Sequence, residues 1–212
     1  MFKDIDFFSA ASILLPLAGG ILRFRSLSND LKWLFLFFLV SAVTEFVAHI
    51  LKMNSVNNLW LGNIFFLLEC FFWSIIITWW LDSKKVRLFI SVFLPAFLIF
   101  WAFTTFFVLD FFVFNNYART IESFAFVFLS CFLLIAVSTD TSEVIFKNPK
   151  FWFGSALLIY FSVNLIVFGT VNYILSNHGQ LMDNTWMIHS VTNIFANLLF
   201  AIGFLWIRQK AI

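Results

Sequence analysis

Three polar residues, His189, Asn193 and Asn197, follow one another at intervals of four in an otherwise apolar segment. On an α-helix, four residues turn about 40° beyond a full turn and rise about 6 Å, so the three side chains form one nearly vertical polar stripe. An imidazole can help to hold a metal ion, and amides can hydrogen-bond a ligand. A stripe of this kind is costly to expose to lipid. We therefore expect it to face a bundle interior, a cavity or a partner.

Carboxyl groups occur in other apolar segments of the chain. Ser41, Glu45 and His49 form a second stripe with the same spacing, and Glu69 and Glu122 lie in two further segments. A charge at the centre of a bilayer costs at least about 2.5–3.5 kcal/mol on insertion scales, so such groups are expected to be paired, protonated, metal-bound or in contact with water. Structural roles remain open as well. Glu45 and His49 could form a local ion pair, and asparagines often hold neighbouring membrane helices together.

The composition is that of an integral membrane protein. The chain is 62% hydrophobic and 22% aromatic, only 11% of its residues are charged, and its mean hydropathy is +0.97, which lies far outside the range of soluble domains. Both cysteines, Cys70 and Cys131, fall within apolar segments, so no disulfide framework is predicted. The net charge of +2 gives no indication of nucleic-acid binding.

Seven apolar segments of spanning length predict an all-α, polytopic membrane protein with seven transmembrane helices. The predicted spans are residues 7–22, 31–51, 59–81, 86–109, 118–137, 151–175 and 186–207. Because the connections are short, we expect residues 1–212 to form a single seven-helix domain, and any signalling would need a separate partner protein. Pro16 and the Gly19-Gly20 pair predict a kink or close packing in the first span.

The distribution of basic residues predicts the orientation. Ten of the 13 Lys and Arg residues flank the first, third and fifth connections or the C-terminus, including Arg208 and Lys210. The opposite side holds Lys3, Lys52 and Arg119, which we count there as flanking charges. By the positive-inside rule the N-terminus is expected outside and the C-terminus in the cytoplasm.

With this orientation, the polar residues of several spans fall between the bilayer midplane and the outer face. The rise per residue also places Tyr160 and Asn164 of the sixth span around the midplane. We therefore predict one outward-facing intramembrane pocket. Its residues are Ser41, Glu45, His49, Glu69, Glu122, Tyr160, Asn164, His189, Asn193 and Asn197.

Three classes of function could use such a pocket. The first, which we favour, is binding or transport of a small molecule from the outer side, with carboxylates that carry protons or pair a cationic ligand. The second is metal-dependent hydrolysis, with Glu45, His49, Glu69 and His189 as candidate ligands of a divalent metal ion and Ser41 or a bound water as the reacting group. The third is a sensor or accessory subunit that acts through a partner, and a homo-oligomer is also open.

Two cofactor classes are disfavoured by the sequence. The last span has no lysine between Trp186 and Trp206 for a retinal Schiff base. The chain also lacks a P-loop and a GxGxxG pattern, so no nucleotide is expected.

Two resemblances add to this interpretation. Ceramidase-like membrane hydrolases have a Ser and a His in the second span, an Asp in the third and an HxxxH pair in the last. Here the last span reads His189-Ser-Val-Thr-Asn193 and the third offers Glu69, so the chain departs from that pattern at two ligand positions.

The second resemblance extends over nearly the whole chain. It rests on Leu15-Pro16-Leu17, Arg23-Phe24-Arg25-Ser26-Leu27-Ser28, Thr44-Glu45, Asn57-Asn58-Leu59-Trp60 leading to Glu69, Phe151-Trp152, and Asn193 with Asn197. In these motifs the chain resembles a group of small seven-helix inner-membrane proteins of bacteria to which no activity is assigned. The resemblance implies the fold and a location in the bacterial cytoplasmic membrane, and it implies no activity.

Overall fold

The computed structural model describes residues 2–140, 144–177 and 181–207, which form an all-helical bundle. In chain order the helices are α1 (Phe2–Ala11), α2 (Leu14–Arg23), α3 (Asn29–Met53), α4 (Leu59–Leu81), α5 (Lys84–Phe103), α6 (Asn116–Thr139), α7 (Pro149–Asn177) and α8 (Met182–Leu205). Two 3-10 turns, η1 (Phe24–Ser26) and η3 (Ile145–Lys147), lie in connections, and a π-helical segment, η2 (Thr104–Val108), extends α5. Arg208 and Lys210 lie outside the described residues.

Seven segments of the described chain are long and apolar enough to cross a membrane. They are Ile5–Ser26, Asn29–Met53, Leu59–Leu81, Lys84–Val108, Asn116–Thr139, Pro149–Ile174 and Met182–Leu205. The seven predicted spans are therefore confirmed as helices, with ends that differ by a few residues. α6 begins two residues before the predicted fifth span and ends two residues after it.

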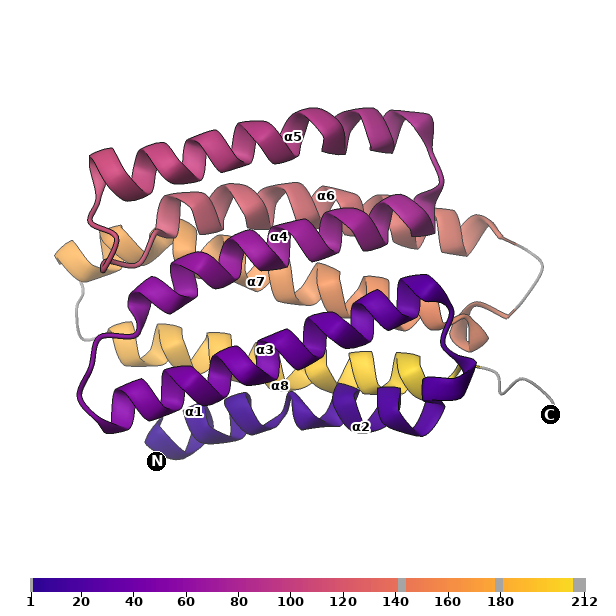
Figure 1. Ribbon diagram of the computed structural model, residues 1–212, viewed down its shortest axis with the longest axis horizontal. Helices are drawn as coiled ribbons and strands as arrows, with labels where there is room; N and C mark the ends of the chain where they lie inside the picture. The colour runs from indigo at the N-terminus through magenta and orange to yellow at the C-terminus, as the bar shows by residue number, and fades with distance from the viewer. Residues whose placement is uncertain (1, 141–143, 178–180, 208–212) are drawn as a thin grey trace.

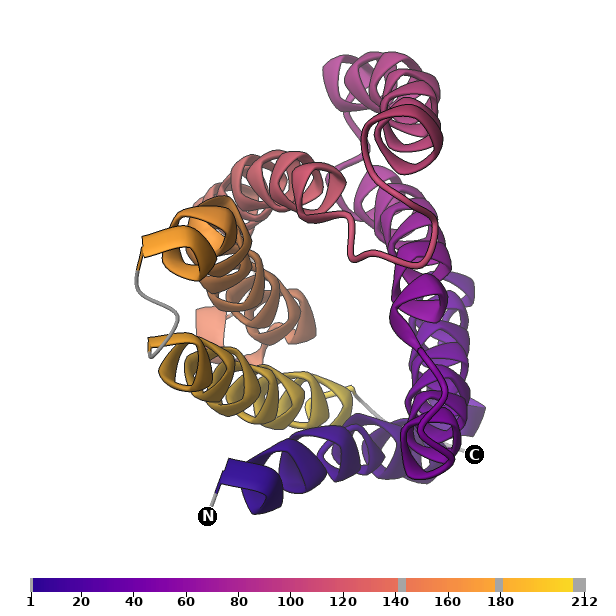
Figure 2. The ribbon, with the colours of Figure 1, turned by 90° about the vertical axis from the view of Figure 1, so that its left-hand side faces the viewer.

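The helices run side by side along the long axis of the molecule (Figure 1). Seen from one end, the first span, α3, α4, α6, α7 and α8 follow one another around a ring, and α5 lies outside it (Figure 2). Contacts between α2 and α3, α3 and α4, α4 and α6, α6 and α7, α7 and α8, and α8 and α2 close this ring. One end of the bundle, called here the N-terminal end, is where α1 begins, α3 ends and α4 begins. The other, the basic end, carries Arg23, Arg25, Lys84, Lys85 and Lys147.

The first span is interrupted between α1 and α2, which agrees with the kink predicted from Pro16 and the glycine pair. The break falls at Ser12 and Ile13, just before Pro16, which has no backbone N–H to continue the helical ladder. The Ser12 hydroxyl donates to the carbonyl oxygen of Ser9 at 2.6 Å. Beyond the break, α2 packs closely on α8, where a Cβ atom on Gly19 would lie 3.0 Å from the Cβ of Phe204.

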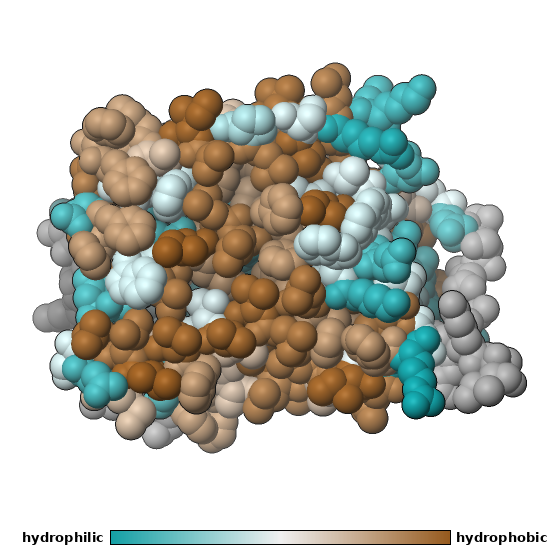
Figure 3. All heavy atoms as spheres, in the orientation of Figure 1, coloured by the Kyte–Doolittle hydropathy of each residue, from teal (hydrophilic) through white to brown (hydrophobic). Residues whose placement is uncertain are grey.

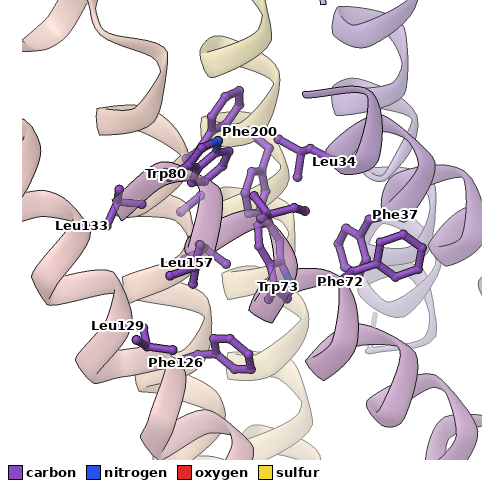
Figure 4. Packing of buried hydrophobic residues seen from close by; sticks show 14 of the residues in the cluster. Leu34, Phe37, Phe72, Trp73, Trp80, Phe126, Leu129, Leu133, Leu157 and Phe200 are labelled. Atoms are coloured by element: carbon purple, nitrogen blue, oxygen red, sulfur yellow. The ribbon is translucent and has the colours of Figure 1, made fainter. Parts of the chain in front are cut away.

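Aromatic side chains fill the half of the bundle nearer the basic end (Figure 4). Trp73 stacks on Phe200 with ring centroids 5.5 Å apart, and Trp80 stacks on Phe153 at 5.4 Å. These rings come from α4, α7 and α8, so they close the middle of the ring at this depth. A Cβ atom on Gly203 would lie 2.3 Å from the Phe153 ring, so the packing here depends on a residue without a side chain.

The outer surface is mostly apolar, as expected for a lipid-facing protein. Figure 3 shows one face that is largely hydrophobic across its middle, with hydrophilic residues gathered toward the right-hand end. α5 leaves an apolar groove of about 750 Å³ against α6, bordered by rings such as Phe89, Phe93, Phe124 and Phe128.

Candidate functional site

Arg119, in the first turn of α6, joins three helices in the interior. Its side chain is only 2% exposed. Nη1 donates to Glu69 of α4 and to Glu122 of α6, the latter at 2.7 Å, and Nη2 donates to the Tyr160 hydroxyl of α7 at 2.7 Å. The ring of Phe66 faces the guanidinium, with its centroid 4.8 Å from Cζ, which is a favourable place for a cation. The side chain thus fixes α4, α6 and α7 relative to one another.

This buried cluster holds more acid than base. Glu69 and Glu122 are 2% and 0% exposed and share one guanidinium. Buried charges recover their lost hydration only when their remaining polar atoms are also bonded, and here Arg119 Nε and Glu122 Oε1 have no hydrogen-bond partner among the described residues. With both carboxyl groups ionised, the cluster carries one net negative charge. A proton or a bound cation would balance it.

His189 of α8 lies beside this cluster. Its Nδ1 is 2.8 Å from the side-chain oxygen of Asn164 on α7. Because an amide oxygen only accepts, the pair places a proton on Nδ1 and leaves Nε2 as the acceptor of a neutral imidazole. The imidazole also packs among aromatic rings, with centroids 5.5 Å from Phe168, 6.1 Å from Trp186 and 6.4 Å from Tyr160.

The three polar residues of the stripe on α3, Ser41, Glu45 and His49, have different surroundings. The Ser41 hydroxyl donates to the Phe37 carbonyl oxygen at 2.9 Å, so its own helix satisfies it. Within the described residues, Glu45 and His49 have neither a hydrogen bond nor an ion pair, and the local pair between them does not form. Glu45 is therefore a carboxyl group near the middle of a spanning helix with no protein partner.

Hydrogen bonds hold α8 against the first span. They run from Ser190 to Asp6 (2.9 Å), from Asn193 to Ser9 (3.0 Å) and from Asn197 to Ser12 (2.8 Å). The two asparagines of the last-span stripe thus bind the neighbouring helix, whereas His189 turns toward α7. The Asn197 bond ends at the Ser12 hydroxyl, which lies at the break between α1 and α2.

Three neighbouring cavities occupy the half of the bundle nearer the N-terminal end. A deep one of about 80 Å³ has Trp73 and Phe200 at its floor. A second, of about 470 Å³, lies between α1, α3 and α8 and reaches Lys52 at the end of α3. A third, of about 320 Å³, lies between α3, α4, α7 and α8 and reaches Arg119. Glu45 and His189 border all three.

Most of the residues predicted for the pocket come together at these cavities. The cavities are bordered by Ser41, Glu45, His49, Glu69, Tyr160, His189, Asn193 and Asn197. The other two lie behind this wall. Glu122 is bonded to Arg119, and Asn164 is bonded to His189.

The sequence-based treatment of Arg119 as a flanking outer charge is wrong, because Arg119 is a buried partner of two carboxylates. Its position three residues before Glu122 could have indicated this pairing, because residues three apart lie on the same helix face. Asp6, Ser9 and Ser12 were likewise not predicted as partners of α8. Their spacing of three residues along the first span was the corresponding signal.

Few side chains at this site are free to coordinate a metal ion. Within the described residues, no three His, Cys, Asp or Glu side chains converge. Of the four predicted ligands, Glu69 is bonded to Arg119 and His189 Nδ1 to Asn164. Glu45, His49 and the Nε2 atom of His189 are the donors that these bonds leave. The divalent metal site stays a prediction.

Comparison with known proteins finds no matching family model, no matching curated protein and no matching solved structure. The fold and site by themselves define the class: an all-helical bundle with seven segments suited to crossing a membrane and a polar interior in one half.

Proposed function

We propose that the chain is a multi-pass protein of the bacterial cytoplasmic membrane that binds or transports a small molecule entering from the outer side. The observation that carries the proposal is the Glu45 carboxyl group, which borders all three cavities and has no protein partner in the described chain. An unpaired carboxyl group is expensive inside a membrane, and such groups typically mark ligand or ion pathways.

The direction of entry follows from the two ends of the bundle. The basic end is the cytoplasmic one by the positive-inside rule. The cavities lie in the other half, and the second one reaches Lys52 and Asn58 where α3 ends and α4 begins. Toward the cytoplasm, the stacked rings of Trp73 and Phe200 close the path. A binding protein needs only this state, whereas a transporter also needs one in which this packing opens.

The two other classes stay predictions. Metal-dependent hydrolysis is tested by elemental analysis of the purified wild type and of His189→Ala, where a stoichiometric metal lost in the variant would favour it.

The direct test is a screen of small molecules against the purified chain by thermal unfolding, with two variants in parallel. Glu45→Gln removes the unpaired charge at nearly constant shape. Asp183→Asn is the matched control, because Asp183 is an exposed acid in the first turn of α8 that borders none of the three cavities. We expect a ligand to raise the unfolding temperature of the wild type and of Asp183→Asn but not of Glu45→Gln. Equal stabilisation of all three proteins by every active compound would count against the proposal.

A further inference from the structure

Around the cavities, acidic side chains outnumber those of Lys and Arg. Arg119, at the third cavity, is already shared by Glu69 and Glu122. Asp6 accepts a hydrogen bond from Ser190, and Lys52 lies in the last turn of α3 at the outer rim of the second cavity. In the region common to all three cavities, Glu45 is the acidic group with neither a hydrogen bond nor an ion pair in the described chain.

Aromatic rings form much of the wall that faces this charge. The third cavity is bordered by Phe65, Tyr160, Phe168 and Trp186. The faces of such rings attract cations, most strongly where water is excluded. The protein already uses this effect at the same place, because the guanidinium of Arg119 lies 4.8 Å from the Phe66 centroid and 5.4 Å from the Tyr160 centroid.

The same features disfavour other ligand charges. An anion would meet Glu45 and would find Arg119 already occupied by two carboxylates. A neutral molecule would leave Glu45 either as a desolvated carboxylate without a partner or as a protonated acid, and in neither form would the negative charge contribute to binding. A cation, in contrast, would satisfy the carboxylate and the ring faces together. The larger two cavities, about 470 and 320 Å³, are of a size that holds a small organic molecule.

From this charge and aromatic pattern we infer that the molecule bound in the cavities is a small organic cation of the ammonium class, held between the Glu45 carboxylate and the aromatic wall. The inference rests on the proposed function and specifies its ligand class. Glu45 supplies the counter-charge, and Trp186, Tyr160 and Phe168 supply the ring faces.

The experiment uses probes matched in shape and different in charge. Choline and tetramethylammonium are the cationic probes, 3,3-dimethylbutan-1-ol is the uncharged counterpart of choline, and sodium chloride keeps the ionic strength constant. Unfolding of the purified full-length chain is followed against probe concentration for the wild type, Glu45→Gln, Glu45→Asp and Asp183→Asn. We expect a cationic probe to stabilise the wild type and Asp183→Asn, with affinity at least about tenfold weaker in Glu45→Gln, which is the scale of one lost charge contact. Glu45→Asp keeps the charge and is expected to bind more tightly than Glu45→Gln.

Each outcome either supports or overturns the proposed ammonium ligand. Absence of stabilisation by both cations, equal stabilisation by the uncharged counterpart, or equal binding to Glu45→Gln would overturn it. The unfolding temperature of Glu45→Gln without a probe shows whether that variant is folded. If the uncharged probe, or a neutral compound from the screen, stabilises the wild type but not Glu45→Gln, the ligand class falls while the proposed function stands. If no compound of any class gives Glu45-dependent stabilisation, both fail.

Discussion

Glu45 and Glu69 are both carboxyl groups within spanning helices, but their surroundings give them different roles. Glu69 is held, together with Glu122, by the guanidinium of Arg119, and this cluster fastens α4 to α6 and α7. Glu45 faces the cavities with no protein partner in the described residues. At the residue scale we therefore assign structure mainly to the arginine cluster and ligand recognition mainly to Glu45.

The structural role of Arg119 is tested by Arg119→Gln. This change leaves two carboxyl groups buried without a cation, and removing one partner of a buried ion pair costs about 3–5 kcal/mol. We expect a clearly lower unfolding temperature in detergent than for the wild type. Glu69→Gln is the contrasting variant, since Glu122 still pairs the arginine, and it should unfold close to the wild type.

A compensated variant separates lost charge balance from lost packing. Arg119→Met combined with Glu69→Gln and Glu122→Gln removes every charge of the cluster, and uncharged replacements of buried ion pairs are often well tolerated. It should recover much of the stability lost in Arg119→Gln. A triple variant no more stable than Arg119→Gln would mean that the ion pairs themselves are needed.

Sequence alone could place most of the pocket residues but not the partner of its acids. Residues spaced by four along an apolar segment share one helix face, so the sequence could predict the two polar stripes. Arg119 lies close to the end of its span, beside Asn115 and Asn116, where a basic residue resembles an interfacial charge. Its burial depends on carboxyl groups from α4 and from the next turn of α6, and no local pattern states which helices are neighbours.

At the scale of elements, the ring depends on close approach between helices near the basic end. Gly203 of α8 faces the ring of Phe153 on α7, where an added Cβ atom would lie 2.3 Å away. Among the described residues, a Cβ atom added to Gly62 of α4 would meet nothing within 4 Å beyond the local helix backbone and would lie in open space. The two glycines therefore provide a matched pair within spanning helices.

We expect Gly203→Ala and Gly62→Ala to act in opposite directions. Overpacking at Gly203 should destabilise by about 1–3 kcal/mol, whereas alanine at Gly62 should stabilise by about 0.5–1 kcal/mol because glycine is unfavourable within a helix. Thermal unfolding of both variants beside the wild type measures the difference. Equal effects at the two positions would show that α7 and α8 do not pack as described.

The positions of the spans followed from apolar length, and the kink of the first span followed from its proline and glycines. Two element-level features did not. The π-helical segment from Thr104 to Val108 has no distinct hydropathy, because a change in hydrogen-bond register leaves the apolar pattern intact. The contact of α8 with the first span could not be predicted either, because periodicity shows which helix face is polar but not which helix packs against it.

At the scale of the whole molecule, the two halves of the bundle differ in kind. Around Trp73 and Phe200 the interior is closed by aromatic packing (Figure 4), while the cavities and the unpaired carboxyl group lie toward the N-terminal end. Taken with the excess of basic residues at the opposite end, this asymmetry supports a site that faces outward.

The most direct measurement is labelling of a cysteine at position 45 in whole cells with a thiol reagent that does not cross membranes. The background carries alanine in place of Cys70 and Cys131. Asn54→Cys, at the exposed end of α3, is the positive control, and Ser138→Cys, near the basic end of α6, is the negative one. We expect Glu45→Cys and Asn54→Cys to be labelled from outside and Ser138→Cys to remain unlabelled. Labelling of Ser138→Cys but not of Glu45→Cys from that side would contradict the outward-facing site.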